Sequence, residues 1–315
     1  MSTTPSAKII ADSISPNGHR LTTFEVEVHR FVLAEFNTHR VFSRNSASSR
    51  AIPVTKQLAR VTEDPAFPIK WPAEQAGMQG GAELEGWDLE QAQGVFRYFQ
   101  DETTANIKHY LQAVSDQYGI SWDDPDPERI KELKSHTLHK SLLNRLIEPI
   151  MWHKIIVTAA EYENYFRQRV SPLAQPEIEV AAAAMQALMD SEPVELGFGE
   201  WHTPYISAEE RDENDVEVTK RVSVARCARV SYLTHDGVRD VSVDLDLYEK
   251  LVSANPPHWS PTEHVATPDP DNAFNVYEYE PGIGDGILVG QVPVLGNFVG
   301  WRQMRHEFKY WEPAT

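Results

Sequence analysis

The chain has 315 residues, of which 41% are hydrophobic and 10% aromatic, so it supports one domain spanning residues 1–315 with a substantial core. Its formal net charge of −18 disfavours a protein that wraps duplex nucleic acid, and the lack of long apolar runs, including at the start, predicts no membrane span and a cytoplasmic location. Cys227 is the only cysteine, which excludes a disulfide framework, a Cys-rich zinc site and an internal redox pair.

The first predicted element is a strand pair at residues 8–28. A Pro-Asn-Gly turn at 16–18 separates two apolar segments. In the second segment Phe24, Val26 and Val28 alternate with charged neighbours, which is typical of a half-buried strand. The pattern therefore predicts a hairpin.

A polar segment at 36–53 follows a predicted short helix over 30–36. Basic side chains alternate there with hydroxyl and amide side chains: His39, Arg40, Ser43, Arg44, Asn45, Ser46, Ser48, Ser49 and Arg50. Arg grips a phosphate bidentately while hydroxyl and backbone N–H groups fill its remaining oxygens, so the segment predicts an anion site for a nucleotide phosphate. Composition alone supports a solvated Ser-rich loop equally well.

We interpret the next segments as connections and structural elements. Pro and Gly are concentrated in 51–90, which we interpret as an irregular connection or lid. The apolar spacing from Asp88 to Tyr118 predicts a structural helix, which a Pro-containing acidic run at 123–127 ends. Farther along, we interpret 205–221 as a solvated acidic loop.

Residues 128–190 carry a long helical pattern, in which Pro149 marks a kink or a boundary. Arg167 and Arg169 lie near its end, among acidic residues. On the residues alone, the preferred interpretation is a core helix whose arginines pair with nearby carboxylates such as Glu161, Glu163 and Glu177.

The spacing within the polar segment resembles the signature of the flavin-dependent thymidylate synthases, the ThyX family. In that signature Arg-His-Arg is followed after seven residues by Ser, with an Asn between them and an Arg two residues later. The positions kept in this chain are His39, Arg40, Asn45, Ser48 and Arg50. Thr38 stands where the family has its first Arg, and Ser46 where it usually has Glu.

A second block of the same family resembles residues 145–178. There the family has an Arg before Leu-Pro, then an Asn five residues before an Arg, then Ala-Gln-Trp-Glu-Ile. The positions that keep identity and spacing are Arg145, Asn164, Arg169, Gln175, Glu177 and Ile178. Thr158 and Ala160 stand where the family commonly has flavin-contacting Asn and Arg, Leu173 replaces a His, and Pro176 replaces Trp.

Two further elements resemble the family, Ala-Arg-Cys-Ala-Arg-Val-Ser-Tyr at 225–232 and His-Trp-Ser-Pro-Thr-Glu-His at 258–264. In the family they precede the Arg-His-Arg motif, whereas here they come long after it. Residues 298–307 again resemble the helix that leads into Arg-His-Arg, and Arg305-His306 is in register with Thr38-His39. The chain therefore resembles a circularly permuted member, which is physically reasonable where termini lie close together.

The resemblance implies an α+β fold in which an antiparallel sheet packs with helices in permuted order. It implies FAD as cofactor, with NADPH and methylenetetrahydrofolate as co-substrates. The implied reaction is one-carbon transfer to C5 of a pyrimidine deoxynucleotide monophosphate, most directly dUMP to dTMP. It also implies a homo-oligomer, a tetramer in the family, with sites between subunits.

The resemblance assigns roles to individual residues. Arg169 would be catalytic, since it would hydrogen-bond the pyrimidine carbonyl and stabilise enolate charge. The substrate would be bound by Ser46, Ser48, Ser49, Arg50, Arg145 and Arg169. The flavin would be lined by His39, Arg40, Ser43, Asn45, Asn164, Ser231, His258, Ser260 and Glu263.

The sequence gives less support to a cysteine nucleophile or a metal site. Cys227 has no adjacent His, so nothing marks it as an activated nucleophile, and the flavin-dependent family needs none. His258, Glu263 and His264 lack a recognised ligand spacing, so no metal site is expected. The Ser-Pro-Thr-Glu sequence at 260–263 instead predicts a helix capping box.

Two alternatives to dTMP synthesis stay open. Thr38 and Ser46 change the signature itself, so dCMP as substrate, or a hydroxymethylated product, is one alternative. The changes at Thr158, Ala160 and Leu173 favour the other, a non-catalytic nucleotide-binding or assembly protein that retains the fold.

Overall fold

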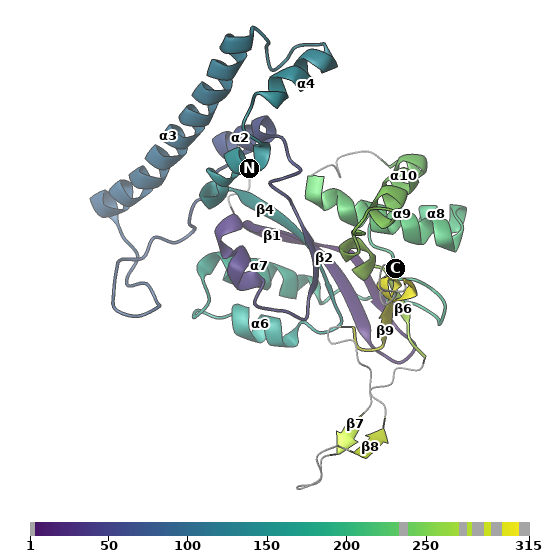
Figure 1. Cartoon of the computed structure of the whole chain (residues 1–315). Coiled ribbons are helices and arrows are strands. Elements are labelled where there is room, and N and C mark those ends of the chain that lie inside the picture. Colours follow the sequence, from purple (N-terminus) through teal and green to yellow (C-terminus); the bar gives the residue numbers. More distant parts are fainter. Residues whose placement is uncertain (1–3, 233–238, 271–275, 279–286, 291–297, 309–315) are drawn as a thin grey trace.

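A five-stranded sheet forms the centre of the computed structural model (Figure 1), which describes residues 4–232, 239–270, 276–278, 287–290 and 298–308. The strand order is β3-β4-β2-β1-β5. The strands are β1 (Ser6–Ile14), β2 (Arg20–His29), β3 (Ser43–Ser46), β4 (Trp152–Ala159) and β5 (Val194–Glu195). Neighbouring strands are antiparallel except for β5, which runs parallel to β1. The class is α+β as predicted, but the sheet is mixed where an antiparallel one was expected.

The predicted strand pair is confirmed as the β1–β2 hairpin. The N–H of Gly18 donates to the carbonyl of Ser15 at 2.9 Å, and Gly18 has φ 79°, a left-handed conformation that glycine adopts readily. The predicted short helix after it is also present, as a 3-10 turn η1 (Arg30–Val32) continued by α1 (Leu33–Phe36).

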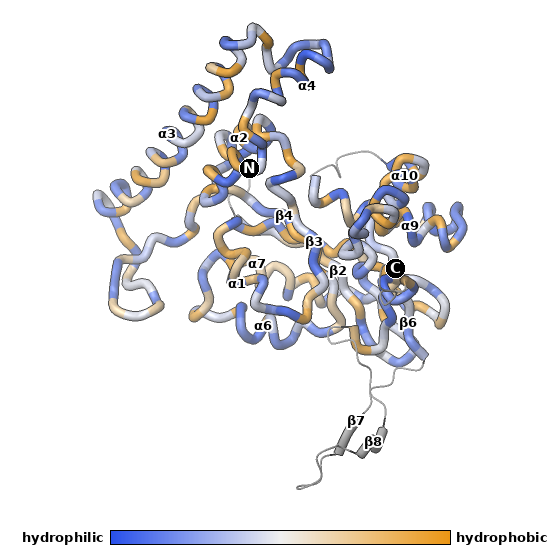
Figure 2. Tube along the Cα trace, in the orientation of Figure 1, coloured by the Kyte–Doolittle hydropathy of each residue, from blue (hydrophilic) through white to orange (hydrophobic). Residues whose placement is uncertain are grey.

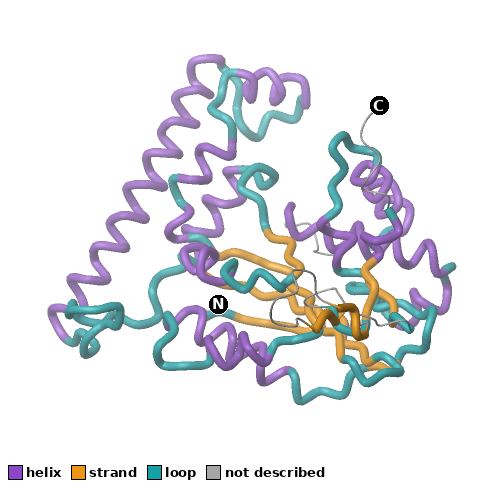
Figure 3. The backbone as a smooth tube through the Cα atoms, turned by 60° about the horizontal axis from the view of Figure 1, so that its bottom comes forward, coloured by secondary structure: helices purple, strands orange, loops and turns teal. Residues whose placement is uncertain are grey.

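The two faces of the sheet are covered by different parts of the chain. Ile155 and Val157 belong to the core that includes residues of α6 (Glu163–Arg169) and α7 (Pro176–Leu188). Ile156 packs instead with Cys227 and Val230. Because successive residues of a strand point to opposite faces, β4 separates an N-terminal helical layer from a C-terminal layer, and helices flank the central strands in Figure 3.

The C-terminal layer is built from short elements. Around α9 (Val216–Arg229) lie α8 (Ala208–Glu213) and α10 (Val241–Val252), and a small antiparallel pair, β6 (Ala266–Pro268) with β9 (Trp301–Gln303), accompanies them. The remaining elements of this layer are η3 (Val230–Tyr232), η4 (Ser260–Glu263) and η5 (Met304–Glu307). A second antiparallel pair, β7 (Val276–Glu278) with β8 (Ile287–Gly290), projects away from the body of the chain (Figure 1).

A helical group with its own core lies at one end of the sheet (Figure 1). It comprises α2 (Val54–Glu63), α3 (Gly86–Tyr118), α4 (Pro127–Ser135), α5 (Lys140–Arg145) and η2 (Glu148–Ile150). The helix predicted for 88–118 is confirmed as α3, and Gly119 follows it with φ 62°, the left-handed conformation typical after a helix end. Apolar residues recur along α3 in Figure 2. Among the described residues, no helix combines the length and apolarity that crossing a membrane requires.

Two predictions for the first half of the chain were wrong. Residues 54–63 form helix α2 inside the segment expected to be irregular, because Val54, Leu58 and Val61 lie on one helical face and pack with α3. Residues 152–159 form strand β4 in the middle of the predicted long helix. A strand buried on both faces gives an uninterrupted apolar run, which periodicity alone does not distinguish from a buried helix. Pro149 lies at the boundary, in η2.

Three predictions for the second half were also wrong. The acidic run expected in a loop is helical, since Ser207 and Glu210 form a reciprocal capping box at the start of α8. The capping box predicted at 260–263 is a 3-10 turn with no side-chain cap. Residues 301–307, expected to repeat a helix, form β9 and η5 because β9 pairs with β6.

Candidate functional site

The predicted site residues are organised around β3, the edge strand of the sheet. Ser43 lies opposite Thr158 and Asn45 opposite Ile156 on β4, so both side chains face the C-terminal layer. Arg44 lies opposite Val157 and faces the N-terminal helical layer. One short strand therefore presents polar side chains to both layers.

At the start of β3, Arg169 of α6 joins the second family-like block to the first. Its Nε donates to His39 Nε2 at 2.9 Å, and its Nη2 donates to Thr38 Oγ1 at 3.2 Å. Its Nη1 forms an ion pair with Glu35. The carboxylates expected to pair with Arg169, on its own segment, do not; Glu35 takes that role because α1 and α6 pack together on one face.

His39 is held as a neutral ring. Burial, together with the charges of Arg169 and Arg44, lowers the pKa of His39 to about 4. Its Nε2 accepts from Arg169, so its proton lies on Nδ1. The ring stacks on Phe42 and meets the edge of Tyr165 at a centroid distance of 4.8 Å. His39 is therefore an acceptor at neutral pH, fixed in orientation.

At the other end of β3, residues 48–52 form a tight turn. The N–H of Arg50 donates to Ser48 Oγ at 3.3 Å. Asn144 Nδ2 donates to the carbonyls of Ser49 and Ile52, at 2.9 and 3.0 Å. Asn144 thus anchors the turn to α5, whose next residue is Arg145. Sequence reasoning gave Asn144 no role, although it adjoins the matched Arg145.

The turn also meets the third family-like block. The N–H of Ser48 donates to the carbonyl of Ser231 at 3.1 Å, so η3 lies against the start of the turn. Two residues predicted for different ligands, Ser48 for the substrate and Ser231 for the flavin, are therefore in direct contact through their backbones.

The fourth block reaches β3 through Gln303. Gln303 Nε2 donates to Ser43 Oγ at 3.0 Å and to the carbonyl of Glu263 at 2.9 Å. The Glu263 side chain forms an ion pair with Arg305. Gln303 lies in the matched segment 298–307, and it connects Ser43 with Glu263, two of the predicted flavin residues.

Four cations around β3 form no ion pair within the part of the chain that the structure describes. Arg40, Arg50 and Arg145 are exposed, and Arg44 is half-buried, with a pKa lowered by burial. None of the four forms an ion pair with another residue in the described ranges. The contact of Arg44 that the structure does show runs from its Nη1 to the carbonyl of His39, at 3.4 Å. In a chain of net charge −18, such arginines are available to bind an anion.

Four predicted residues are not tied to this cluster. Asn164 is exposed on α6, where its Oδ1 accepts from Arg167. His258 and Ser260 are exposed at the approach to η4, which contacts β3. Ser46 is partly exposed on β3. Within the described residues, no side-chain hydrogen bond links these four to the other predicted site residues.

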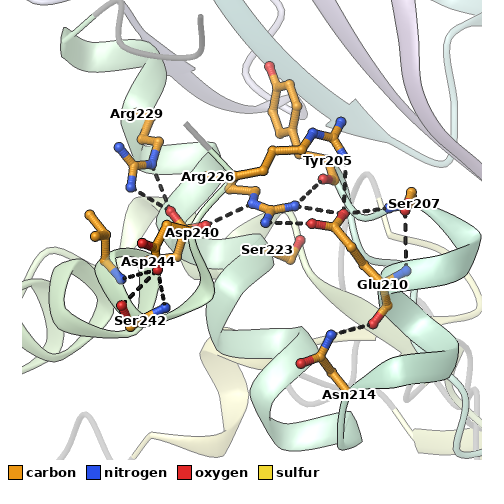
Figure 4. Close-up of polar contacts among 12 residues, drawn as sticks. Tyr205, Ser207, Glu210, Asn214, Ser223, Arg226, Arg229, Asp240, Ser242 and Asp244 are labelled. Carbon is orange, nitrogen blue, oxygen red and sulfur yellow. Dashed lines mark hydrogen bonds and ion pairs between the residues drawn. The ribbon is translucent and has the colours of Figure 1, made fainter. Parts of the chain in front are cut away.

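The C-terminal layer is anchored by buried ion pairs (Figure 4). Asp244 of α10 is fully buried and accepts from Arg226 Nε at 2.9 Å and from Arg229 Nη2 at 2.6 Å. Arg226 also pairs with Glu210 of α8 at 2.7 Å, which lowers the pKa of Glu210 to about 2. These contacts fix the end of α9, and thereby the position of Ser231 in η3.

Cys227 and His264 are both buried and lie apart from the exposed arginines beside β3. Cys227 is fully buried, and burial raises the pKa of its thiol well above the usual range. His264 bonds Thr158 Oγ1 through Nδ1 at 2.7 Å. Within the described residues, no cluster of His, Cys, Asp and Glu is arranged to hold a metal ion.

Comparison with known proteins adds little. No protein-family model matches the chain, and no curated protein matches it. One solved structure that partly superposes on this chain is a UMP/dUMP methylase, PolB from Streptomyces cacaoi, bound with 5-Br dUMP; the TM-score is 0.38, sequence identity is 12%, and the match covers 59% of this chain and 89% of that one. A match of this size carries no argument for a shared activity.

Proposed function

We propose that this chain binds a pyrimidine deoxynucleotide monophosphate beside β3 and transfers a one-carbon unit to its C5, most directly converting dUMP to dTMP with reduced FAD and methylenetetrahydrofolate. One observation carries the proposal. Four segments that resemble ThyX blocks, far apart in the chain, meet at one strand through contacts of Arg169 with His39, of Ser48 with Ser231, and of Gln303 with Ser43.

The nucleotide phosphate would be bound at the 48–52 turn. Arg50 and Arg145 are exposed there and form no ion pair within the described residues, and Asn144 fixes the turn against the helix that carries Arg145. One guanidinium group on the turn and one at the end of α5 would suit the bidentate geometry that phosphate recognition favours. The hydroxyls of Ser46, Ser48 and Ser49 would complete the phosphate and sugar contacts.

The pyrimidine would be oriented by Arg169. A guanidinium carries five N–H donors, of which three are used by Glu35, Thr38 and His39. The two others are free to donate to a pyrimidine carbonyl and to stabilise charge as it develops there. The neutral His39 ring holds the guanidinium in place without adding a competing positive charge.

FAD would be held by residues around β3. Arg40, which forms no ion pair within the described residues, suits its pyrophosphate, while Ser43, Asn45, Ser231 and Glu263 lie along the strand and the elements that cover it, with Asn164, His258 and Ser260 at the periphery. FAD, when reduced by NADPH, supplies the hydride of the one-carbon transfer. The buried Cys227 thiol is not needed as a nucleophile, and the protein's contribution is orientation and electrostatics.

Product analysis tests the proposal. The protein is incubated with FAD, NADPH, methylenetetrahydrofolate and either dUMP or dCMP, and the product mass is measured. A gain of one methyl group on dUMP is expected. Exclusive use of dCMP, or a hydroxymethyl product, would support the first alternative reaction at the same proposed site.

The ion pair between Glu35 and Arg169 favours the second alternative, a non-catalytic nucleotide-binding or assembly protein. A carboxylate already neutralises the arginine that the resemblance makes catalytic, so anion binding at Arg50 and Arg145 can persist without catalysis. Nucleotide binding without FAD binding, in parallel titrations, would support this alternative and remove the flavin from the proposal.

We also expect a homo-oligomer, by resemblance to the tetrameric family. The N-terminal half of α3 exposes Trp87, Val95 and Tyr98, each by more than half of its surface, at 71%, 66% and 68%. Burial of such side chains is a usual result of subunit association. Sedimentation velocity distinguishes the oligomer from a monomer.

A further inference from the structure

A second pocket lies in the C-terminal layer, away from β3. It has a volume of about 300 Å³ and lies between the segment 194–203, which includes β5, and helices α8 and α9. This volume is at the lower end of the range for small-molecule sites. None of its lining residues belongs to the 38–52 segment or to α6, so it is distinct from the proposed nucleotide site.

A buried hydroxyl lies behind the pocket wall. Thr219 lines the pocket and is 6% exposed, and within the described residues its Oγ1 makes no hydrogen bond. An unpaired buried hydroxyl destabilises the folded state. Because this oxygen is buried, the polar contacts of a ligand must come from other lining side chains.

A positive charge also lines the pocket. Arg211 of α8 forms no ion pair with any residue in the described ranges, and the hydrogen bond that it makes is from Nη2 to Thr203 Oγ1 at 3.3 Å. Its charge contributes to the lowered pKa of the neighbouring His202. A ligand carboxylate would give this guanidinium the counter-charge that it lacks.

Part of the lining is apolar and aromatic. Val194 and Val216 are exposed by 56% and 55% at the pocket. The Trp201 ring is covered by Lys220, whose Nζ lies 4.0 Å from the ring centroid. An apolar ligand body would bury the two valines against a ring that is already fixed in place.

Acidic residues restrict the ligand further. Glu195 and Glu200 both line the pocket, and Glu200 Oε2 is fixed by the N–H of Gly197 at 2.6 Å. They repel polyanions such as nucleotides and favour a ligand that also carries a positive charge. We propose that this pocket binds a small zwitterion with an apolar body, of the chemical class of an aromatic α-amino acid, with its carboxylate at Arg211 and its ammonium group at Glu200 or Glu195.

Isothermal titration tests the proposal with three probes. L-Phenylalanine carries both charges, 3-phenylpropionate lacks the ammonium group, and phenethylamine lacks the carboxylate. L-Phenylalanine is expected to bind with a Kd of about 1 mM or below, and each of the other two about tenfold more weakly. Absence of phenylalanine binding, or equal binding of the single-charge probes, overturns the proposal.

Three variants locate the site. Arg211→Gln should weaken phenylalanine binding about tenfold, and Arg211→Lys should restore part of it. Thr219→Val replaces the buried hydroxyl at nearly constant volume, so thermal stability should hold or rise while phenylalanine binding stays within about twofold. Arg97→Gln, at an exposed arginine on α3, is the matched control. Unchanged binding in Arg211→Gln would show that phenylalanine binds elsewhere.

The experiment also separates this site from the proposed function. Saturating dUMP should leave phenylalanine binding unchanged, because the two sites share no lining residues. Competition between dUMP and phenylalanine would overturn the second site. Failure of dUMP to bind at all would count against the proposed function and leave the second site standing.

Discussion

Two groups of arginines differ in how their charge is balanced. Arg226 and Arg229, on α9, are almost fully buried and share the carboxylate of Asp244, with Glu210 as a further partner. Arg50 and Arg145, beside β3, are exposed and pair with no acid in the described residues. The first group stabilises a layer of the fold; the second is available to a ligand.

Arg169 stands between these groups. Its side chain is mostly covered, with 19% exposed, and it pairs with Glu35 and donates to His39 and Thr38; two of its N–H donors have no partner among the described residues. An arginine inside a matched motif is therefore not necessarily a ligand-binding residue. Its carboxylate partners decide the role, and the variants below test that rule.

The largest effect is expected from Asp244→Ala. Removing this carboxylate leaves two buried guanidinium groups without their shared partner, which costs about 3–5 kcal/mol in the free energy of unfolding. Urea denaturation measures the loss. Asp246→Ala, at an exposed position on the same helix, should change stability by less than about 0.5 kcal/mol. Equal effects of the two variants would show that the buried pairs do not hold this layer.

A pH effect should appear in the same layer. His202 and His264 are fully buried and neutral, and burial lowers the pKa of each to about 3. Below the unfolded value of 6.5 the unfolded chain takes up the proton more readily than the folded chain. The stability present above about pH 6.5 is therefore lost as pH falls, by up to about 1.4 kcal/mol per pH unit for each histidine.

Urea denaturation between about pH 7.5 and about pH 5 measures this slope, in a range where most carboxylates stay ionised. His264→Gln should reduce this slope by the contribution of one histidine. The two rings belong to one buried chain of hydrogen bonds, since Thr23 Oγ1 bonds both His202 Nε2 and Thr158 Oγ1. If His264→Gln leaves the slope unchanged, the pH dependence does not come from the buried neutral ring of His264.

Much of the local structure was predictable because its signals are local. The hairpin follows from strand alternation and a turn that needs glycine, and α3 ends where Gly119 takes a left-handed conformation. The strand β4 was missed because Ile155, Ile156 and Val157 are all buried, one of them against a different layer from the other two. No period distinguishes such a run from a helix.

The candidate site was predictable only in part. The family resemblance assigned His39 and Arg169 to one site, and the two side chains are in contact. Spacing did not reveal Glu35 or Gln303 as partners, since a hydrogen bond between residues far apart in the chain depends on how whole elements pack. The acidic run at 209–215 shows the same limit: Glu210 pairs with Arg226 of the following helix, which composition alone does not indicate.

The unpaired arginines give the next prediction. Arg50→Ala and Arg145→Ala should each weaken dUMP binding about tenfold, equivalent to about 1.4 kcal/mol, because each removes a charged hydrogen-bond donor from the phosphate. Unfolding free energies should be almost unchanged, since both side chains are exposed. Isothermal titration and urea denaturation measure the two quantities, with Arg97→Ala as the control. If the variants instead lose stability and keep their affinity for dUMP, these arginines belong to the structural group, like Arg226 and Arg229.

The smallest effect is expected from Glu35→Gln. This substitution removes the negative charge beside Arg169 and keeps the shape of the side chain. The ion pair is partly solvated, with the two side chains 19% and 22% exposed, so stability should fall by no more than about 1 kcal/mol. Affinity for dUMP should rise about threefold, because the carboxylate no longer competes for the guanidinium or repels an incoming anion. Arg169→Gln should abolish that gain when combined with Glu35→Gln. If Glu35→Gln instead weakens dUMP binding, the carboxylate positions Arg169 productively, and a fixed partner on an arginine is then part of the binding site.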